Sequence, residues 1–143
     1  MTSDRIARDY LQQAQARRIA LDALFAASAH PAVVRESQEV VELVPKGALR
    51  FVGVDPPKRH DVNRVVEQFV ERFPPAWRQT VTELRESLDR LVQDRAAAFY
   101  GNEAEDIPAS ELFGEAEARH VMTVAERLLD LYTRLLGEER GAR

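Results

Sequence analysis

Residues 75–99 read PAWRQTVTELRESLDRLVQDRAAAF, which indicates an α-helical protein. The large apolar side chains of this stretch are spaced four, three, four and three residues apart: Trp77, Val81, Leu84, Leu88 and Leu91. This spacing lines one face of an α-helix, so we predict a helix over residues 75–99 with that face in an apolar core. The next inward position is Arg95. An inward guanidinium must pair with an acid or bind an anion, because an unpaired buried charge is costly.

The rest of the chain also divides into helical segments, which prolines and glycines separate. The expected elements are a helix over residues 3–28, a helix from Pro31 to Gly53, a short helix from Asp61, as its cap, to Phe73, a single turn over residues 109–113 and a last helix after Gly114. They predict an all-α protein, an up-and-down four-helix bundle with an additional short helix between the second and third long helices. A chain of 143 residues fits one domain, so we assign residues 1–143 to a single domain with flexible ends, especially residues 137–143.

Each of the other long helices carries an apolar face of its own. The side chains expected inside are Ile6, Tyr10, Ala14, Leu21, Leu24 and Phe25 in the first helix, Val34, Ser37, Val41, Val44, Ala48 and Phe51 in the second, and Val121, Val124, Leu128, Leu131 and Leu135 in the last. Pro45 disturbs the second helix, because it lacks the N–H that would bond the carbonyl of Val41 and its ring crowds that carbonyl. We therefore predict a kink at Pro45, with Gly47 adding backbone flexibility beside it.

The composition excludes several classes of protein. The net charge of −4 argues against the broad phosphate-binding surface of a nonspecific DNA-binding protein. The sequence has no cysteine for disulfides or zinc, no apolar run of the ~18 residues that a membrane span needs, and no signal-peptide pattern. We expect a cytoplasmic protein with no membrane segment. His30 and His120 lie at no metal-ligand spacing and glycine-rich nucleotide fingerprints are absent, so we predict no metal and no cofactor.

Basic residues gather in one short stretch. It contains the only two lysines, Lys46 and Lys58, together with Arg50, Arg59 and His60. Such a stretch is usually a solvated charged surface, and the alternative is an anion-binding site. The sequence leaves both interpretations open.

Two separated stretches follow a recognisable pattern. Residues 32–61 read AVVRESQEVVELVPKGALRFVGVDPPKRHD, a helix with Gln, Glu and Lys four residues apart and then Gly-x-x-Pro-Pro-x-x-His-Asp. The positions concerned are Gln38, Glu42, Lys46, Gly53, Pro56, Pro57, His60 and Asp61. Residues 95–103 read RAAAFYGNE and are followed by Pro108 and the last helix. In these stretches, which together with the last helix cover most of residues 32–136, the chain resembles the HEPN domain family.

The resemblance implies a bundle of four or five helices that is commonly a homodimer. Such a domain is often encoded beside a minimal nucleotidyltransferase, as one half of a two-component or toxin–antitoxin pair. Many catalytic members are metal-independent ribonucleases with an arginine, four to six intervening residues and a histidine. This sequence departs from that motif, because the window after Arg95 offers only Tyr100, Gly101 and Asn102. Pro45 is a second departure, at a position where the family pattern predicts an ordinary helix former.

The candidate site combines two helices. Gln38, Glu42 and Lys46 share one edge of the second helix, so an i to i+4 pair between Glu42 and Lys46 is expected whatever the function. We name Gln38, Glu42, Lys46, Arg95 and Tyr100 as ligand-binding candidates, and Arg95, Tyr100 and His60 as catalytic candidates. Arg95 with Tyr100 would hold a phosphate and stack on a base. The alternative is a structural clamp, in which Arg95 pairs with Glu42 or Glu39.

Three functions follow from this set. The first is a nucleotide- or RNA-linked binding module that works through a partner and is not a strong enzyme alone, since tyrosine is a poor proton-transfer group at neutral pH. The second is a variant ribonuclease in which His60 transfers the proton and Arg95 holds the phosphate. The third is a structural homodimer without a ligand, its polar side chains paired internally.

Overall fold

The computed structural model describes the backbone of residues 4–141 and the side chains of residues 4–137. Within this range the secondary structure is helical, as the sequence predicted. The elements are α1 (Asp4–Ala26), α2 (His30–Phe51), α3 (Asn63–Gln68), a 3-10 turn η1 (Val70–Arg72), α4 (Pro75–Gln93), α5 (Arg95–Tyr100), α6 (Ala109–Leu112) and α7 (Glu115–Gly141). The prediction of an all-α bundle with four long helices and a short one between the second and third is confirmed.

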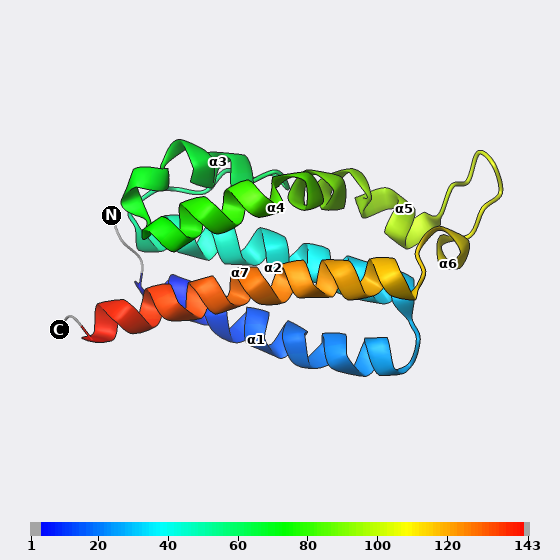
Figure 1. Ribbon diagram of the computed structural model, residues 1–143, viewed down its shortest axis with the longest axis horizontal. Helices are drawn as coiled ribbons and strands as arrows, with labels where there is room; N and C mark the ends of the chain where they lie inside the picture. The colour runs from blue at the N-terminus through cyan, green and yellow to red at the C-terminus, as the bar shows by residue number, and fades with distance from the viewer. Residues whose placement is uncertain (1–3, 142–143) are drawn as a thin grey trace.

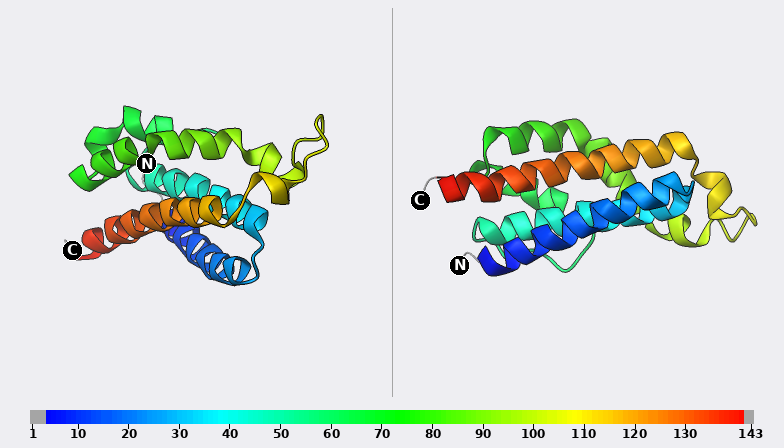
Figure 2. Two further views of the ribbon diagram at one scale, coloured as in Figure 1. Left: turned by 45° about the vertical axis from the view of Figure 1, so that its right-hand side comes forward. Right: turned by 90° about the horizontal axis from the view of Figure 1, so that it is seen from below.

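The four long helices alternate in direction, which makes the up-and-down arrangement visible in Figure 1. Helix α2 packs against both α1 and α7, and α4 packs against α7. The N-terminal end of α1 and the C-terminal end of α7 lie at the same end of the bundle. At the other end, α5, α6 and the loop between them project beyond the long helices (Figure 2).

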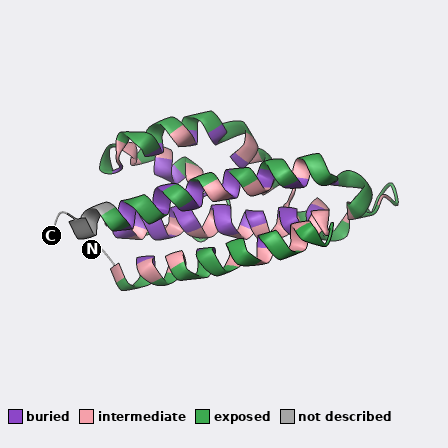
Figure 3. Ribbon diagram, turned by 60° about the horizontal axis from the view of Figure 1, so that its bottom comes forward, coloured by how far each residue is buried: buried purple, intermediate pink, exposed green. Residues whose placement is uncertain are grey.

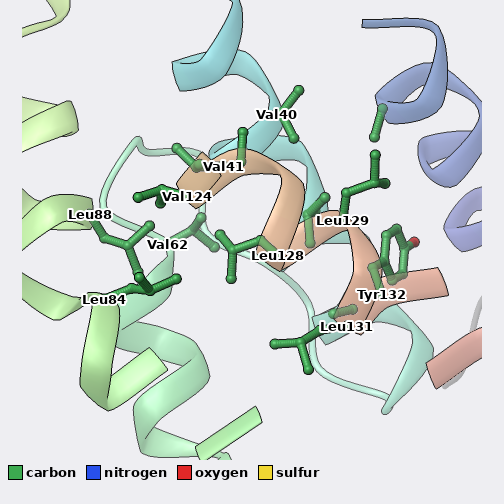
Figure 4. Close-up of a cluster of buried hydrophobic side chains, with 14 of the residues drawn as sticks. Val40, Val41, Val62, Leu84, Leu88, Val124, Leu128, Leu129, Leu131 and Tyr132 are labelled. Carbon is green, nitrogen blue, oxygen red and sulfur yellow. The ribbon is translucent and has the colours of Figure 1, made fainter. Parts of the chain in front are cut away.

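The apolar faces predicted for α2, α4 and α7 form the core. All of their members are buried, and Figure 3 shows the buried positions turned toward the neighbouring helices. In Figure 4, Leu84 and Leu88 of α4 meet Val124 and Leu128 of α7. Full burial of each such side chain contributes roughly 1.5–3 kcal/mol to the free energy of folding.

The prediction for α1 was wrong at one position. Ile6 is 41% exposed, whereas Ala7, Ala14 and Leu21 are fully buried. These three residues are seven apart, so a narrower face of mostly small side chains contacts the bundle. Tyr10 packs only partly buried beside them.

Helix α2 continues without a break through Pro45. Gly47 also has a packing role that was not predicted: a Cβ atom there would overlap the side chain of Tyr132. Tyr132 is completely buried, and its hydroxyl donates a hydrogen bond to the carbonyl of Ala7. Burial raises the pKa of the Tyr132 hydroxyl above its usual value. Gly47 therefore lets a tyrosine of α7 pass close to α2 and reach α1.

The helix predicted over residues 75–99 is in fact two helices. Helix α4 ends at Gln93, α5 begins at Arg95, and Asp94 between them has φ −84° and ψ 1°. Aspartate is a weak helix former, because its side chain competes for local backbone hydrogen bonds. The break gives α5 its own direction and lets it lie against α2. Gly101, at φ +75°, ends α5 in a conformation that favours glycine.

Other boundaries also differ from the predictions. Asp61 does not cap the short helix, because its carboxylate pairs with Arg59 Nε at 2.9 Å and α3 begins at Asn63. Helix α7 continues through residues 137–141, beyond the last predicted apolar position. The flexibility predicted for the ends falls partly on residues 1–3 and 142–143, which lie outside the described residues. None of the described helices is long and apolar enough to cross a membrane.

Candidate functional site

The candidate site lies on the face of α2 opposite its apolar face. Arg35, Glu39, Glu42 and Lys46 are spaced four, three and four residues apart, which puts them in one stripe along the helix. The connector after α2 doubles back along this stripe. Asn63 fixes its return, because the side-chain amide donates a 3.2 Å hydrogen bond to the carbonyl of Val41.

Three basic side chains converge on the carboxylate of Glu42. Lys46 Nζ lies 2.7 Å from Glu42 Oε1, while His60 Nδ1 lies 2.8 Å and Arg95 Nη1 3.2 Å from Glu42 Oε2. Arg95 Nη2 also lies 3.5 Å from Glu39 Oε1. We call Glu42, Lys46, His60 and Arg95 the Glu42 cluster. It joins α2, the connector and the start of α5.

The cluster is half-buried. The side chains of Glu42, Lys46 and Arg95 are 16%, 22% and 22% exposed, and that of His60 is 54% exposed. Burial alone would raise the pKa of Glu42. Hydrogen bonds and charges from Lys46 and His60 outweigh burial, so the pKa of Glu42 lies below its ordinary value of 4.5. Glu42 is therefore ionised at neutral pH and holds the basic groups in place.

The structure places the two other candidates, Gln38 and Tyr100, outside these contacts. Gln38 is 2% exposed, and its amide nitrogen donates a 3.0 Å hydrogen bond to the carbonyl of Leu91. It ties α2 to α4, and among the described residues its Oε1 has no hydrogen-bond partner. Tyr100 is 64% exposed at the other end of α5, where its ring packs 4.7 Å from that of Phe99.

Three residues near the site, Arg35, Asn63 and Phe99, were not predicted from the sequence. Arg35 lies with its guanidinium carbon 4.8 Å from the centre of the Phe99 ring. The sequence spacing could have indicated Arg35 and Phe99. Arg35 is four residues before Glu39 and Phe99 is four residues after Arg95, so each shares a helix face with a candidate site residue. Asn63 gave no such signal, since only the doubled-back connector brings it to α2.

The chemistry available is anion binding and proton transfer. Arg95 and Lys46 keep unused N–H donors, because an arginine has five and a lysine three. His60 uses Nδ1 toward Glu42, which leaves Nε2 of a half-exposed ring to exchange a proton with a ligand. The described residues contain no group of three or more side chains that could hold a metal ion.

A family model, described as the HEPN domain, matches residues 7–136. The chain belongs to the HEPN domain family. Among curated proteins and among solved structures, no match was found. Membership supports a nucleotide- or RNA-related module in the broad sense, and HEPN domains often dimerise. The matched range contains all four residues of the Glu42 cluster.

Proposed function

We propose that this HEPN domain binds the phosphate of a nucleotide or of RNA at the Glu42 cluster and acts through a partner in the cytoplasm. The observation that supports this function most is the position of Arg95. It follows Leu91 in an apolar register, yet lies 3.2 Å from Glu42, beside Lys46 and His60. Arginine presents a planar fork of donors that matches a phosphate, especially in a partly desolvated site.

The charges of Arg95, Lys46, Glu42 and Glu39 cancel, so a phosphate is favoured only when it displaces Glu39 from Arg95 and leaves the other three with a net positive charge. Arg95 and Lys46 contribute two positive charges, and Glu42 and Glu39 contribute two negative ones. A phosphate that binds Arg95 would replace the longer contact, the 3.5 Å approach of Glu39, and keep the shorter one with Glu42.

The same contacts also fit a structural clamp, in which the pairs of Arg95 with Glu42 and Glu39 only stabilise the bundle. The two functions differ in what a ligand does. A phosphate site binds ligand and loses it in Arg95→Ala, whereas a clamp binds nothing and loses only stability.

Isothermal titration calorimetry with a short single-stranded RNA and with mononucleotides tests the proposal. We expect binding by the wild-type protein and at least a tenfold loss in Arg95→Ala, since removal of a charge-assisted pair costs about 1.5–3 kcal/mol. Arg127→Ala is the matched control, because Arg127 forms an exposed pair with Glu83 at 2.7 Å between α4 and α7. Absence of binding by the wild-type protein would refute the phosphate site.

The partner is the second part of the proposal. We propose a homodimer that associates with a minimal nucleotidyltransferase, in a two-component pair of the toxin–antitoxin kind. The family resemblance supports this partner. Co-expression with a nucleotidyltransferase encoded next to this chain, followed by size-exclusion chromatography with light scattering, tests it. A complex supports the pairing, and separate elution of the two proteins at micromolar concentrations contradicts it.

One observation favours an alternative function, a variant ribonuclease. A histidine whose Nδ1 faces a carboxylate is oriented for proton transfer through Nε2, and His60 with Glu42 has this arrangement. A gel assay on RNA decides the matter. Cleavage that is lost in both His60→Ala and Arg95→Ala, and kept in Arg127→Ala, would establish the ribonuclease. RNA that stays intact at high protein concentration would exclude it.

A further inference from the structure

A second feature adjoins the Glu42 cluster: an open groove of about 610 Å³ between α1, α2 and α5. Its lining residues are Arg17, Leu24, Ala32, Arg35, Glu36, Glu39, Ala98 and Phe99. Glu39 belongs to both places, since it lines the groove and contacts Arg95. The volume lies in the range of about 300–1,000 Å³ that is typical of small-molecule sites.

The groove contains a platform for a flat aromatic ligand. Phe99 is 59% exposed, although it is a large apolar side chain, and the Arg35 guanidinium lies over its ring at 4.8 Å. Tyr100, also exposed, packs against the same ring. Nucleobases stack on aromatic rings and on guanidinium planes, so this group fits a base.

The α2 residues that line the groove also offer hydrogen-bond acceptors. Glu36 pairs with Arg17 at 2.6 Å through Oε1, and Glu39 approaches Arg95 through Oε1. Each carboxylate has a second oxygen, Oε2, which remains an acceptor. Guanine carries two adjacent donors on one edge, N1–H and the 2-amino group, which suit the two free oxygens, because residues three apart are neighbours on a helix surface. Uracil has a single N–H between two carbonyls and would be repelled.

The spacing between the platform and the Glu42 cluster suits one nucleotide. Arg95 and Phe99 are four residues apart on α5, and their partners on α2, Glu39 and Arg35, are also four apart. Four residues of an α-helix rise about 6 Å, which is comparable to the separation of base and phosphate across a ribose. A single nucleotide is therefore long enough to span four residues along α2.

We propose that this groove is a base-binding subsite for a guanine nucleotide whose phosphate binds at the Glu42 cluster. The inference rests on the proposed function, and it adds the ligand class. Phe99 and Arg35 stack on the base, Glu36 and Glu39 accept hydrogen bonds from its edge, and Arg95 holds the phosphate.

Calorimetry with three probes tests the subsite: guanosine 5′-monophosphate, uridine 5′-monophosphate and inorganic phosphate. We expect the guanine nucleotide to bind at least tenfold more tightly than the other two. Phe99→Ala should lower its affinity about tenfold, since loss of one stacked base is worth about 1–3 kcal/mol. Phosphate affinity should not change in that variant. Ile19→Ala is the matched control, because Ile19 is an exposed apolar residue, 74% accessible, that does not line the groove.

The failures of the subsite and of the phosphate site are distinguishable. If Arg95→Ala weakens all probes and Phe99→Ala weakens none, the subsite is refuted and the phosphate site stands. If neither nucleotide nor phosphate binds the wild-type protein, both are refuted. Thermal melting of Phe99→Ala separates binding from folding, and its exposed side chain predicts an unchanged melting temperature.

Discussion

The two faces of α2 differ in how they contribute to the molecule. On one face, Val34, Val44 and Ala48 are fully buried in the core that α2 shares with α1 and α7. On the other, Glu42 and Lys46 are half-buried and paired with charges from the connector and from α5. The apolar face holds the bundle together. The charged face is half-buried and paired, so it adds less to stability than the core and keeps basic groups within reach of solvent.

The largest effect should come from the apolar face. Leu128 of α7 is completely buried, so Leu128→Ala removes its contacts and leaves a cavity. We expect a loss of about 3 kcal/mol in the free energy of unfolding, measured by urea denaturation. Affinity for phosphate should stay unchanged at a temperature where the variant is folded. A loss below 1 kcal/mol would mean that this part of the core is poorly packed.

A smaller loss is expected on the charged face. Arg95→Ala removes one partner of Glu42, while Lys46 and His60 continue to neutralise that carboxylate. We expect destabilisation of about 1–2 kcal/mol, less than for a fully buried pair, together with loss of ligand binding. Arg127→Ala should leave stability nearly unchanged, because exposed pairs contribute little. A loss near that of Leu128→Ala would favour the structural clamp.

The charged face should also produce a pH dependence. The pKa of Glu42 lies below 4.5 in the folded protein. Its ionised form therefore stabilises the fold above pH 4.5, and this contribution is lost as the pH falls through the folded pKa. Glu42→Gln should be less stable than the wild type at pH 7, with a gap that narrows in acid. Denaturation curves from pH 7 to pH 3 measure it, and a constant gap would contradict the pKa shift.

The smallest effect concerns the break between α4 and α5. Burial raises the pKa of Asp94 above 3.8; the charge of Arg90 opposes this shift and that of Glu117 adds to it. The ionised form thus costs stability at neutral pH. Asp94→Asn should stabilise the protein by ~0.5 kcal/mol at pH 7, since the group is partly exposed, and the gain should vanish in acid. Destabilisation at pH 7 would show that the carboxylate is needed at the helix break.

Much of the fold could be predicted from the sequence. The apolar faces of α2, α4 and α7 repeat at helical spacing, so their burial followed directly. Two features depended on tertiary contacts and were missed. Ile6 is as apolar as any core residue, and only the close approach of α1 selects Ala7 in its place. The break at Asp94 was hidden because the apolar register continues across it.

The candidate site was partly predictable. Arg95 occupies an inward position of its helix and therefore needed an acidic partner, and the spacing of Glu42 and Lys46 placed them on one edge of α2. The structure brings these three side chains together. Spacing alone placed Arg35 in line with Glu39 and Phe99 in line with Arg95, but the groove could not be predicted, because the contact of Phe99 with Arg35 depends on the direction in which α5 crosses α2. That direction is set by the break at Asp94, for which the sequence carried no clear signal.

The most direct test of the phosphate site is a titration followed by two-dimensional ¹H–¹⁵N NMR. Inorganic phosphate and a guanine nucleotide would be added to the ¹⁵N-labelled protein while backbone amides and the arginine side-chain Nε–H signals are observed. We expect saturable shifts at Glu39, Glu42 and Arg95, with Phe99 responding only to the nucleotide. Shifts confined to residues outside the charged face of α2, or none at millimolar ligand, would contradict a phosphate site there.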